Sequence, residues 1–515
     1  MNVADLPLLS LITFVPLIGA IVIAFLPRDQ PGLIRAVALA SALISFGLSL
    51  LLLIGFNPTN PAFQYQEVHD WIPAFGIQYK VGVDGLSTIL VVLTTTLSWI
   101  SILASFRPIK TSLKEYMISF LILEVGLVGV FISLDLFLFY IFWEVELVPM
   151  YLIIGIWGGA NRIYATLKFV LYTLVGSLLM LVAILATAFT FQNATGSWVG
   201  AFDFITLRNF AVTSGFVGNL QLFAFLAFFL AFAIKVPMFP VHTWLPDAHT
   251  EAPTAGSVML AAILLKLGAY GMIRFAVPLF PGAAHTFAPI IIVLSLIGIV
   301  YGAIVALVQP DWKRLIAYSS VTHMGFVTLG IFIFQEQGLQ GAIVQMINHG
   351  LITGGLFLLV GVMYERTHDR TIAKFGGLAG RTPVYTAAFG FFVFASAGLP
   401  GLSGFVGEFL VLLGSFAFNP WVGAVTASCM IWAAAYLLYM FQQIFTGQLS
   451  DFLRGLGDHL TDISPIEMLT ILPLAALIVA FGLFPGLILH LVQGSVTTVL
   501  SEVQAVSAIH LFFWQ

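Results

Sequence analysis

Long apolar stretches recur along almost the whole chain, and this repetition constrains the fold more than any other feature. A stretch of about 20 apolar residues is the helix length that crosses the hydrocarbon core of a bilayer. Of the 515 residues, 60% are hydrophobic and 8% are charged, whereas soluble domains carry about 25% charged residues. The sequence therefore excludes a water-soluble fold. It predicts an all-α integral membrane protein, because a helix satisfies its own backbone polar groups in lipid.

The apolar stretches predict about fourteen transmembrane helices in a single membrane domain, residues 1–515. No linker between them is long enough to join two soluble domains. We expect the first stretch to remain as a helix and not to be a signal peptide, because no basic segment precedes it. The predicted spans are 8–26, 36–54, 86–104, 117–132, 136–156, 166–189, 220–245, 257–273, 289–308, 315–334, 341–363, 383–416, 421–445 and 466–491.

Basic residues are distributed unevenly between the loops that join these spans. Fourteen of the 19 lysines and arginines lie in odd-numbered loops, and three lie in even-numbered loops: Lys80, Arg208 and Arg274. Because cytoplasmic loops carry the excess of basic residues, we expect the odd loops to face the cytoplasm or the matrix. Both termini then lie on the periplasmic or outer side.

Several kinds of chemistry are disfavoured by what the sequence contains. Cys429 is the single cysteine, so the chain can build neither a disulfide framework nor a cysteine-ligated metal or iron–sulfur site. A net charge of −4 without a basic cluster gives no support for nucleic-acid binding. No glycine motif for nucleotides is present. We therefore expect no cofactor and no metal in this chain.

Ionisable side chains within the predicted spans are few, and they are the candidate functional residues. A charged group at the centre of a bilayer costs at least about 2.5 kcal/mol, so such groups face the bundle interior and commonly mark ion or proton routes. Burial favours the neutral forms of lysine and glutamate, which brings proton exchange within reach, and histidine exchanges protons near neutral pH. The alternative is a structural ion pair between helices. The candidates are Glu124, Glu144, Glu146, Lys235, Lys266, Glu408, His323 and His349.

Two spans carry the residues that interrupt helices. Lys235 is followed by Pro237, Pro240 and Pro246 in the seventh span, and Glu408 follows a segment rich in proline and glycine, 398–407, in the twelfth. Prolines at this density cannot be accommodated in an unbroken helix. The two interruptions lie five helices apart, which predicts two internal repeats with a transport path at their interface. Because five is odd, the repeats are inverted.

The fifth span carries two glutamates at positions two apart, Glu144 and Glu146. Residues at this spacing point in different directions on a helix, so at most one faces a central axis, and the spacing alone leaves open which. Pro149 frees a carbonyl in the next turn. This favours a hydrated pocket near Glu144.

Four motifs give the chain a specific resemblance. They are FWEVELVPM at 142–150, KVPMFPVHTWLPDAH at 235–249, IAYSSVTHM at 316–324 and LPGLSGFVGE at 399–408. With these motifs the chain resembles the antiporter-like M subunits of proton-pumping NADH:quinone oxidoreductase, respiratory complex I, the type of mitochondrial NADH dehydrogenase subunit 4. The sister L and N subunits carry lysine at the position of Glu408, and the L type adds a long lateral helix for which we expect no room after the fourteenth span.

The resemblance implies a fourteen-helix fold with discontinuous helices seven and twelve. It implies N-terminal helices 1–3 at 1–115, a first repeat at 116–276, an inverted second repeat at 288–446, and helix 14 with a tail at 465–515. It also implies a polar axis along the membrane midplane. The matching residues are Glu144, Lys235, Lys266 and Glu408, with Glu124, His323 and His349 at or near axis positions and Glu146 as an auxiliary.

The function implied is proton translocation coupled to electron transfer from NADH to quinone. NADH, FMN, iron–sulfur clusters and quinone are then expected in other subunits. The expected partners are L-type and N-type antiporter-like neighbours and the lipid bilayer, and the expected location is the bacterial cytoplasmic membrane, with an organellar inner membrane as the alternative. A cation/proton antiporter subunit of the Mrp type, which needs no redox partner, is the competing function.

Overall fold

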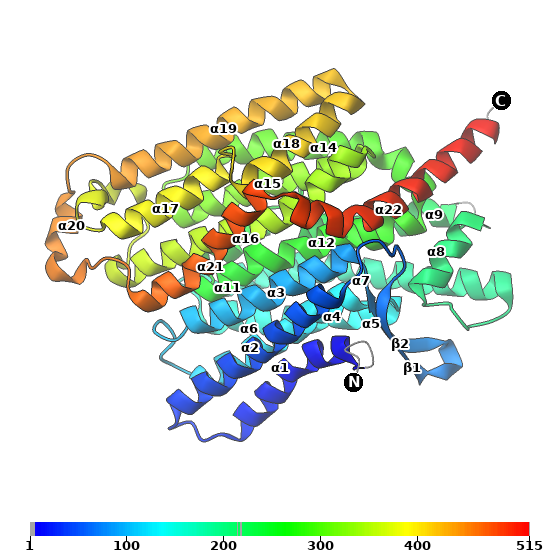
Figure 1. Cartoon of the computed structure of the whole chain (residues 1–515), viewed down its shortest axis with the longest axis horizontal. Helices are drawn as coiled ribbons and strands as arrows, with labels where there is room; N and C mark the ends of the chain where they lie inside the picture. The colour runs from blue at the N-terminus through cyan, green and yellow to red at the C-terminus, as the bar shows by residue number, and fades with distance from the viewer. Residues whose placement is uncertain (1–5, 214, 217–218, 514–515) are drawn as a thin grey trace.

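A computed structural model of the chain describes residues 6–213, 215–216 and 219–513, with side chains to residue 504. Most helices run side by side in one bundle (Figure 1). Thirteen helices are long and apolar enough to cross a membrane, and three shorter apolar helices accompany them among the residues described. The prediction of an all-α membrane protein with about fourteen spans is confirmed.

The N-terminal part consists of three long helices and a β-hairpin between the second and the third. Strands β1 and β2 pair antiparallel, and the hairpin contacts the start of α1, where Glu67 accepts a hydrogen bond from the backbone N–H of Leu9 at 2.9 Å. The sequence analysis did not predict this hairpin. The elements are α1 (Leu8–Phe25), α2 (Pro31–Gly55), β1 (Gln64–Ile72), β2 (Ile77–Val83) and α3 (Gly85–Ala104).

The next group of helices corresponds to the predicted first repeat. Its seventh span is broken between α9 and α10, directly after Lys235, as the prolines predict. The elements are α4 (Leu113–Ile132), α5 (Leu136–Val145), α6 (Leu147–Trp157), α7 (Arg162–Thr195), α8 (Phe204–Thr213), α9 (Asn219–Lys235), α10 (Trp244–Glu251), α11 (Thr254–Met259), α12 (Leu265–Gly271) and α13 (Val277–Leu279).

The remaining helices contain the predicted second repeat. Its twelfth span is broken between α17 and α18, where Gly398 and Gly401 adopt positive φ angles of +78° and +93° that side-chain-bearing residues rarely tolerate. The elements are α14 (Pro281–Leu307), α15 (Trp312–Phe332), α16 (Glu336–Thr367), α17 (Pro383–Ser396), α18 (Ser403–Phe418), α19 (Pro420–Phe445), α20 (Asp451–Gly455), α21 (Pro465–Leu483) and α22 (Gly486–Phe513).

Two predicted spans differ from the structure. The fifth is interrupted by a turn at Glu146, between α5 and α6, since Pro149 has no N–H to bond the carbonyl of Val145. The fourteenth, predicted as 466–491, ends at Leu483. Pro485 separates α21 from a further helix of 28 residues, α22, where the sequence analysis expected a tail.

The two ends of the bundle carry different ion pairs. At the hairpin end, Arg274 pairs with Asp84 at 2.5 Å, and Lys80 pairs with Asp203 at 2.7 Å. Burial opposes ionisation of Asp84, but the Arg274 guanidinium prevails and holds the pKa of that carboxyl below its usual range. The loops richest in lysine and arginine lie at the opposite end, which is called the basic end below.

Candidate functional site

Lys235 and Glu146 form an ion pair in the interior of the bundle. Lys235 is the last residue of α9, and its Nζ bonds to Oε1 of Glu146 in the turn between α5 and α6. Their side chains are 1% and 0% exposed. The ammonium also lies 5.2 Å from the ring centroid of Trp143 and 5.8 Å from that of Phe169. These rings supply cation–π attraction to the charged lysine.

The backbone at Glu146 lies close against α4. A side chain at Gly126 would place its Cβ 2.8 Å from the backbone nitrogen of Glu146, so glycine permits this approach. The second carboxylate oxygen of Glu146 has no hydrogen-bond partner within the described chain. A buried oxygen without a partner is costly, so this atom is poised to accept a proton or a water.

Glu144 does not take part in the ion pair that Glu146 forms with Lys235. It lies in the last turn of α5, half-buried and beside Tyr140, and it does not pair with Lys235. Of the two glutamates, Glu146 is the one that bonds to Lys235, and the axis role expected for Glu144 stays a prediction. The turn at Glu146 interrupts the regular rotation of the helix, so sequence spacing could not decide between them.

Lys266 lies in the eighth span between two π-helical segments, Leu260–Leu264 and Met272–Ala276. Such segments are rare and recur at functional sites. The Lys266 Nζ donates to the carbonyl of Ala261 at 2.6 Å and lies 2.6 Å from Nδ1 of His349 on α16. Both side chains are buried. The contact joins α12 to α16.

His323 and Glu408 form a buried acid–base contact between α15 and α18. The His323 Nδ1 lies 2.7 Å from Oε1 of Glu408, which also accepts from Nε2 of Gln345 at 3.1 Å. On the other side of the ring, Nε2 lies 3.2 Å from the Ser396 hydroxyl and 3.5 Å from the Tyr436 hydroxyl. Glu408 lies in the second turn of α18, just after the break.

The two histidines connect these contacts into one row. The ring centroids of His323 and His349 are 5.9 Å apart, and both rings line a cavity of about 10 Å³ together with Glu408 and Gln345. That volume is at the lower limit for a single water. The row Lys266, His349, His323 and Glu408 is called the central row below. Within the described residues no hydrogen bond joins it to the Lys235–Glu146 pair.

Glu124 lies apart from both groups. It is fully buried on α4, beside Ser45 and Ser98, whose hydroxyls donate to the carbonyls of Ile12 and Thr94. Neither oxygen of its carboxyl has a hydrogen-bond partner among the residues described. The structure thus places Glu124 in the interior but does not connect it to the central row.

Three polar residues that contact the central row were missed in the sequence analysis, Gln345, Ser396 and Tyr436. A signal existed for the first, since Gln345 and His349 are four residues apart and therefore share one face of α16. The other two lie in apolar runs without any pattern. Within the described part of the chain, no group of three or more His, Cys, Asp or Glu side chains could hold a metal ion.

Comparisons with known proteins identify the family. The profile described as NADH:quinone oxidoreductase/Mrp antiporter, TM, matches residues 133–432. NADH-quinone oxidoreductase subunit M of Rhodobacter capsulatus is 48% identical over 512 residues, which is 97% of each chain. The chain belongs to the family of antiporter-like M subunits of NADH:quinone oxidoreductase. Members of this M-subunit family are proton-translocating membrane subunits of an oxidoreductase complex, and the expected function is confirmed at this level.

Solved structures agree with membership of the M-subunit family. A chain of respiratory complex I from Thermus thermophilus with bound NADH superposes with a TM-score of 0.84 at 32% identity, over 96% of this chain and 99% of that one. A chain of the Mrp complex from a Dietzia species superposes with a TM-score of 0.83 at 21% identity, over 98% and 100%. The second likeness shows a shared fold alone. The competing Mrp function is therefore the weaker one.

Proposed function

We propose that this M subunit moves protons through its interior by way of the Lys235–Glu146 pair and the central row. The observation that carries the proposal is the direct contact of Lys266 with His349, because it joins a buried lysine of α12 to a buried histidine of α16 by a hydrogen bond. Proton transfer needs donor and acceptor at about this separation, 2.6–3.2 Å between heavy atoms.

The Lys235–Glu146 pair acts as the switch. While the pair is closed, each charge stabilises the other in a site from which water is excluded. When the pair opens, each group is left as a buried charge without a partner, and burial then favours the neutral form of both. Lys235 therefore releases a proton and Glu146 takes one up. Opening and closing of the Lys235–Glu146 pair therefore converts a structural change into a change in the protonation of both residues.

The central row passes a proton from Lys266 to Glu408. The ammonium of Lys266 gives a proton to Nδ1 of His349, and the resulting imidazolium releases the proton on its other nitrogen. A water in the adjoining cavity can carry that proton to the ring of His323. His323 then protonates Oε1 of Glu408 through the contact at 2.7 Å.

Glu144 is assigned a role at the contact with a neighbouring subunit. Its side chain is partly exposed and is close enough to Glu146 for their charges to interact. We assign it to the exchange of protons with an adjacent antiporter-like subunit of the L or N type, packed against α5. NADH, FMN, the iron–sulfur clusters and quinone belong to other subunits, whose redox reaction drives the switch.

Replacing His349 with glutamine tests the central row. The glutamine carbonyl still accepts from Lys266, but an amide cannot take up a proton and pass it on. We expect at least about a tenfold loss of proton translocation in the intact complex, reconstituted in vesicles and followed by a pH-sensitive dye during NADH oxidation. His459→Gln, in an exposed turn near α20, is the matched control and should behave as wild type. Normal pumping by the assembled His349→Gln complex would exclude His349 from the route.

The bacterial cytoplasmic membrane is the proposed location, with the basic end toward the cytoplasm. Single cysteines placed at 107–114 and at 366–374 of a Cys429→Ala chain are expected to react with an impermeant maleimide only from the cytoplasmic side of oriented membranes. Cysteines in the β-hairpin, 64–83, should react only from the periplasmic side. The reverse pattern would contradict the orientation and leave the central row unaffected.

A further inference from the structure

A cavity of about 480 Å³ opens at the basic end, between the last residues of α3 and α16 and the first residues of α11 and α21. It lies away from the central row and takes no part in the proposed proton route. Its position is at the helix ends, where the apolar core of a bilayer gives way to the lipid headgroups. The volume lies in the range of small-molecule binding sites.

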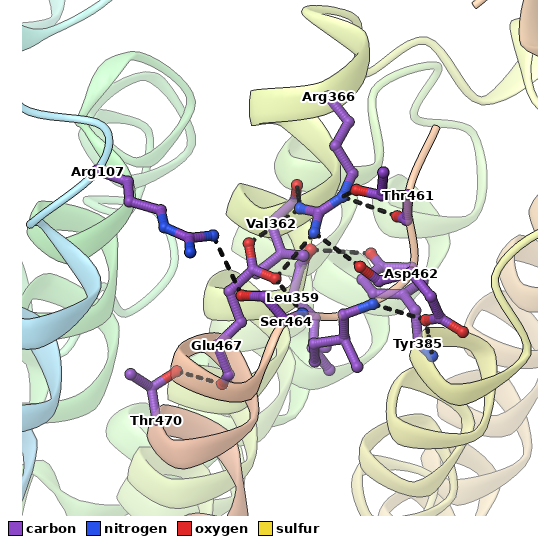
Figure 2. Close-up of polar contacts among 11 residues, drawn as sticks. Arg107, Leu359, Val362, Arg366, Tyr385, Thr461, Asp462, Ser464, Glu467 and Thr470 are labelled. Atoms are coloured by element: carbon purple, nitrogen blue, oxygen red, sulfur yellow. Dashed lines mark hydrogen bonds and ion pairs between the residues drawn. The ribbon is translucent and has the colours of Figure 1, made fainter. Parts of the chain in front are cut away.

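One wall of the cavity is an ion pair whose charges are already satisfied. Arg366 binds Glu467 through both terminal nitrogens, at 3.0 Å and 2.8 Å (Figure 2). Its Nε also donates to the carbonyl of Thr461 at 2.8 Å, and Glu467 accepts from the backbone N–H of Ser464 at 2.7 Å. These groups fix α21 to α16. Because the charges of Arg366 and Glu467 neutralise each other, this wall offers no net charge to a ligand.

The rim of the cavity carries two further cations, Arg107 and Lys110, and both are exposed. Arg107 donates a hydrogen bond to the Ser464 hydroxyl at 3.2 Å from one terminal nitrogen, and Figure 2 shows its guanidinium directed toward the Arg366–Glu467 wall. Glu365 is the one carboxylate of the rim. With the Arg366–Glu467 pair cancelled, the rim has a surplus of one positive charge, so it suits an anion.

The remaining lining is apolar and continues toward the bilayer. Leu103, Leu358 and Val362 line the cavity, and Ile466, at its edge, leaves 44% of its surface exposed. A ligand that matches both parts has an anionic head and a hydrocarbon chain. Basic pockets between transmembrane helices on the cytoplasmic side of a membrane bind the head groups of anionic lipids in this way.

We propose that this cavity is a binding site for an anionic phospholipid, whose phosphate is held by Arg107 and Lys110 and whose acyl chain begins against Leu103, Leu358 and Ile466. The charged rim recognises the head group, and the apolar wall distinguishes a lipid from a free anion. The lipid joins α3, of the N-terminal part, to α16 and α21.

Photocrosslinking in the intact complex tests the site. The probes are a phosphatidylglycerol and a phosphatidylcholine that carry the same diazirine near the start of one acyl chain, each mixed into vesicles that hold the complex. We expect phosphatidylglycerol to label 358–366 and 461–470 about tenfold more than phosphatidylcholine, because each rim cation favours an anionic head. In a complex with Arg107→Gln and Lys110→Gln together, labelling by phosphatidylglycerol should fall to the phosphatidylcholine level.

The control variant is Arg381→Gln, which removes an exposed arginine of the same end that does not line the cavity. It should leave the labelling unchanged. Equal labelling by the two lipids, or labelling that persists in the double variant, would overturn the proposal. So would loss of labelling in an excess of inorganic phosphate, which indicates a site for a free anion, or the absence of labelling with both probes, which indicates that another subunit covers the cavity.

Discussion

Lys235→Ala is expected to abolish proton translocation, with at least about a hundredfold loss, because the switch loses its exchangeable proton. The same change leaves Glu146 buried without a partner, which destabilises a protein by about 3–5 kcal/mol. Loss of pumping must therefore be separated from loss of assembly. The measurement is proton uptake by vesicles that contain the complex, with NADH:quinone reductase activity and subunit content recorded on the same preparation.

Two further variants make that separation. Lys235→Arg keeps the positive charge beside Glu146 but cannot release a proton, so it should assemble and still fail to pump. Replacing the pair by Lys235→Met with Glu146→Leu removes both buried charges and should also assemble without pumping. Arg28→Ala, which removes an exposed ion pair with Glu115, is the control with wild-type activity. If the arginine variant pumps normally, Lys235 supplies a fixed charge and the switch is elsewhere.

Glu408→Gln is expected to remove most proton translocation while the complex assembles normally. The glutamine carbonyl can accept the bonds that His323 and Gln345 give to Oε1, so the packing around α18 is kept and only the titratable group is lost. Glu408→Asp should retain partial pumping, since the carboxyl remains but lies one methylene further from His323. Dye-monitored proton uptake during NADH oxidation measures both variants.

The exposed Glu336→Gln, in the first turn of α16, is the matched control for Glu408 and should leave pumping unchanged. A purely structural role for Glu408 predicts the opposite order of the two variants, because glutamine preserves length and hydrogen bonding and aspartate does not. Pumping by Glu408→Gln that equals or exceeds that of Glu408→Asp would therefore falsify the relay through this residue.

The sequence predicts the features of this fold that depend on local chemistry. The apolar runs predict the spans, because a bilayer requires both their length and their composition. The prolines after Lys235 and the glycines before Glu408 predict the two breaks, because both residue types destabilise the interior of a helix. The burial of Lys266, His323 and His349 follows in the same way from the cost of polar groups in lipid.

The remaining features depend on contacts between distant segments. Glu146 lies against Lys235 because a turn separates α5 from α6. Gly126 also contributes, since it lets the backbone of α4 approach the backbone at Glu146. Neither condition can be read from the spacing of Glu144 and Glu146. Tyr436 contacts His323 through the packing of α19 against the central row, which no periodicity encodes. The β-hairpin lies outside the apolar pattern on which the prediction rested, and the separation of α21 from α22 at Pro485 falls inside one predicted apolar run.

The helix α22 limits how the two halves of the protein can move. It crosses the hairpin end and bonds to four separate segments: to Asp84 through Ser495 at 2.6 Å, to Glu336 through Gln493 at 2.9 Å, to Arg208 through Glu502 at 3.3 Å and to His285 through the carbonyl of Val503 at 3.3 Å. Rocking of one repeat against the other, as in many transporters, would shear these bonds with every cycle. The hairpin end therefore behaves as a clamped edge. Access from the two sides of the membrane is then expected to alternate through small rearrangements of side chains and water inside a nearly rigid frame.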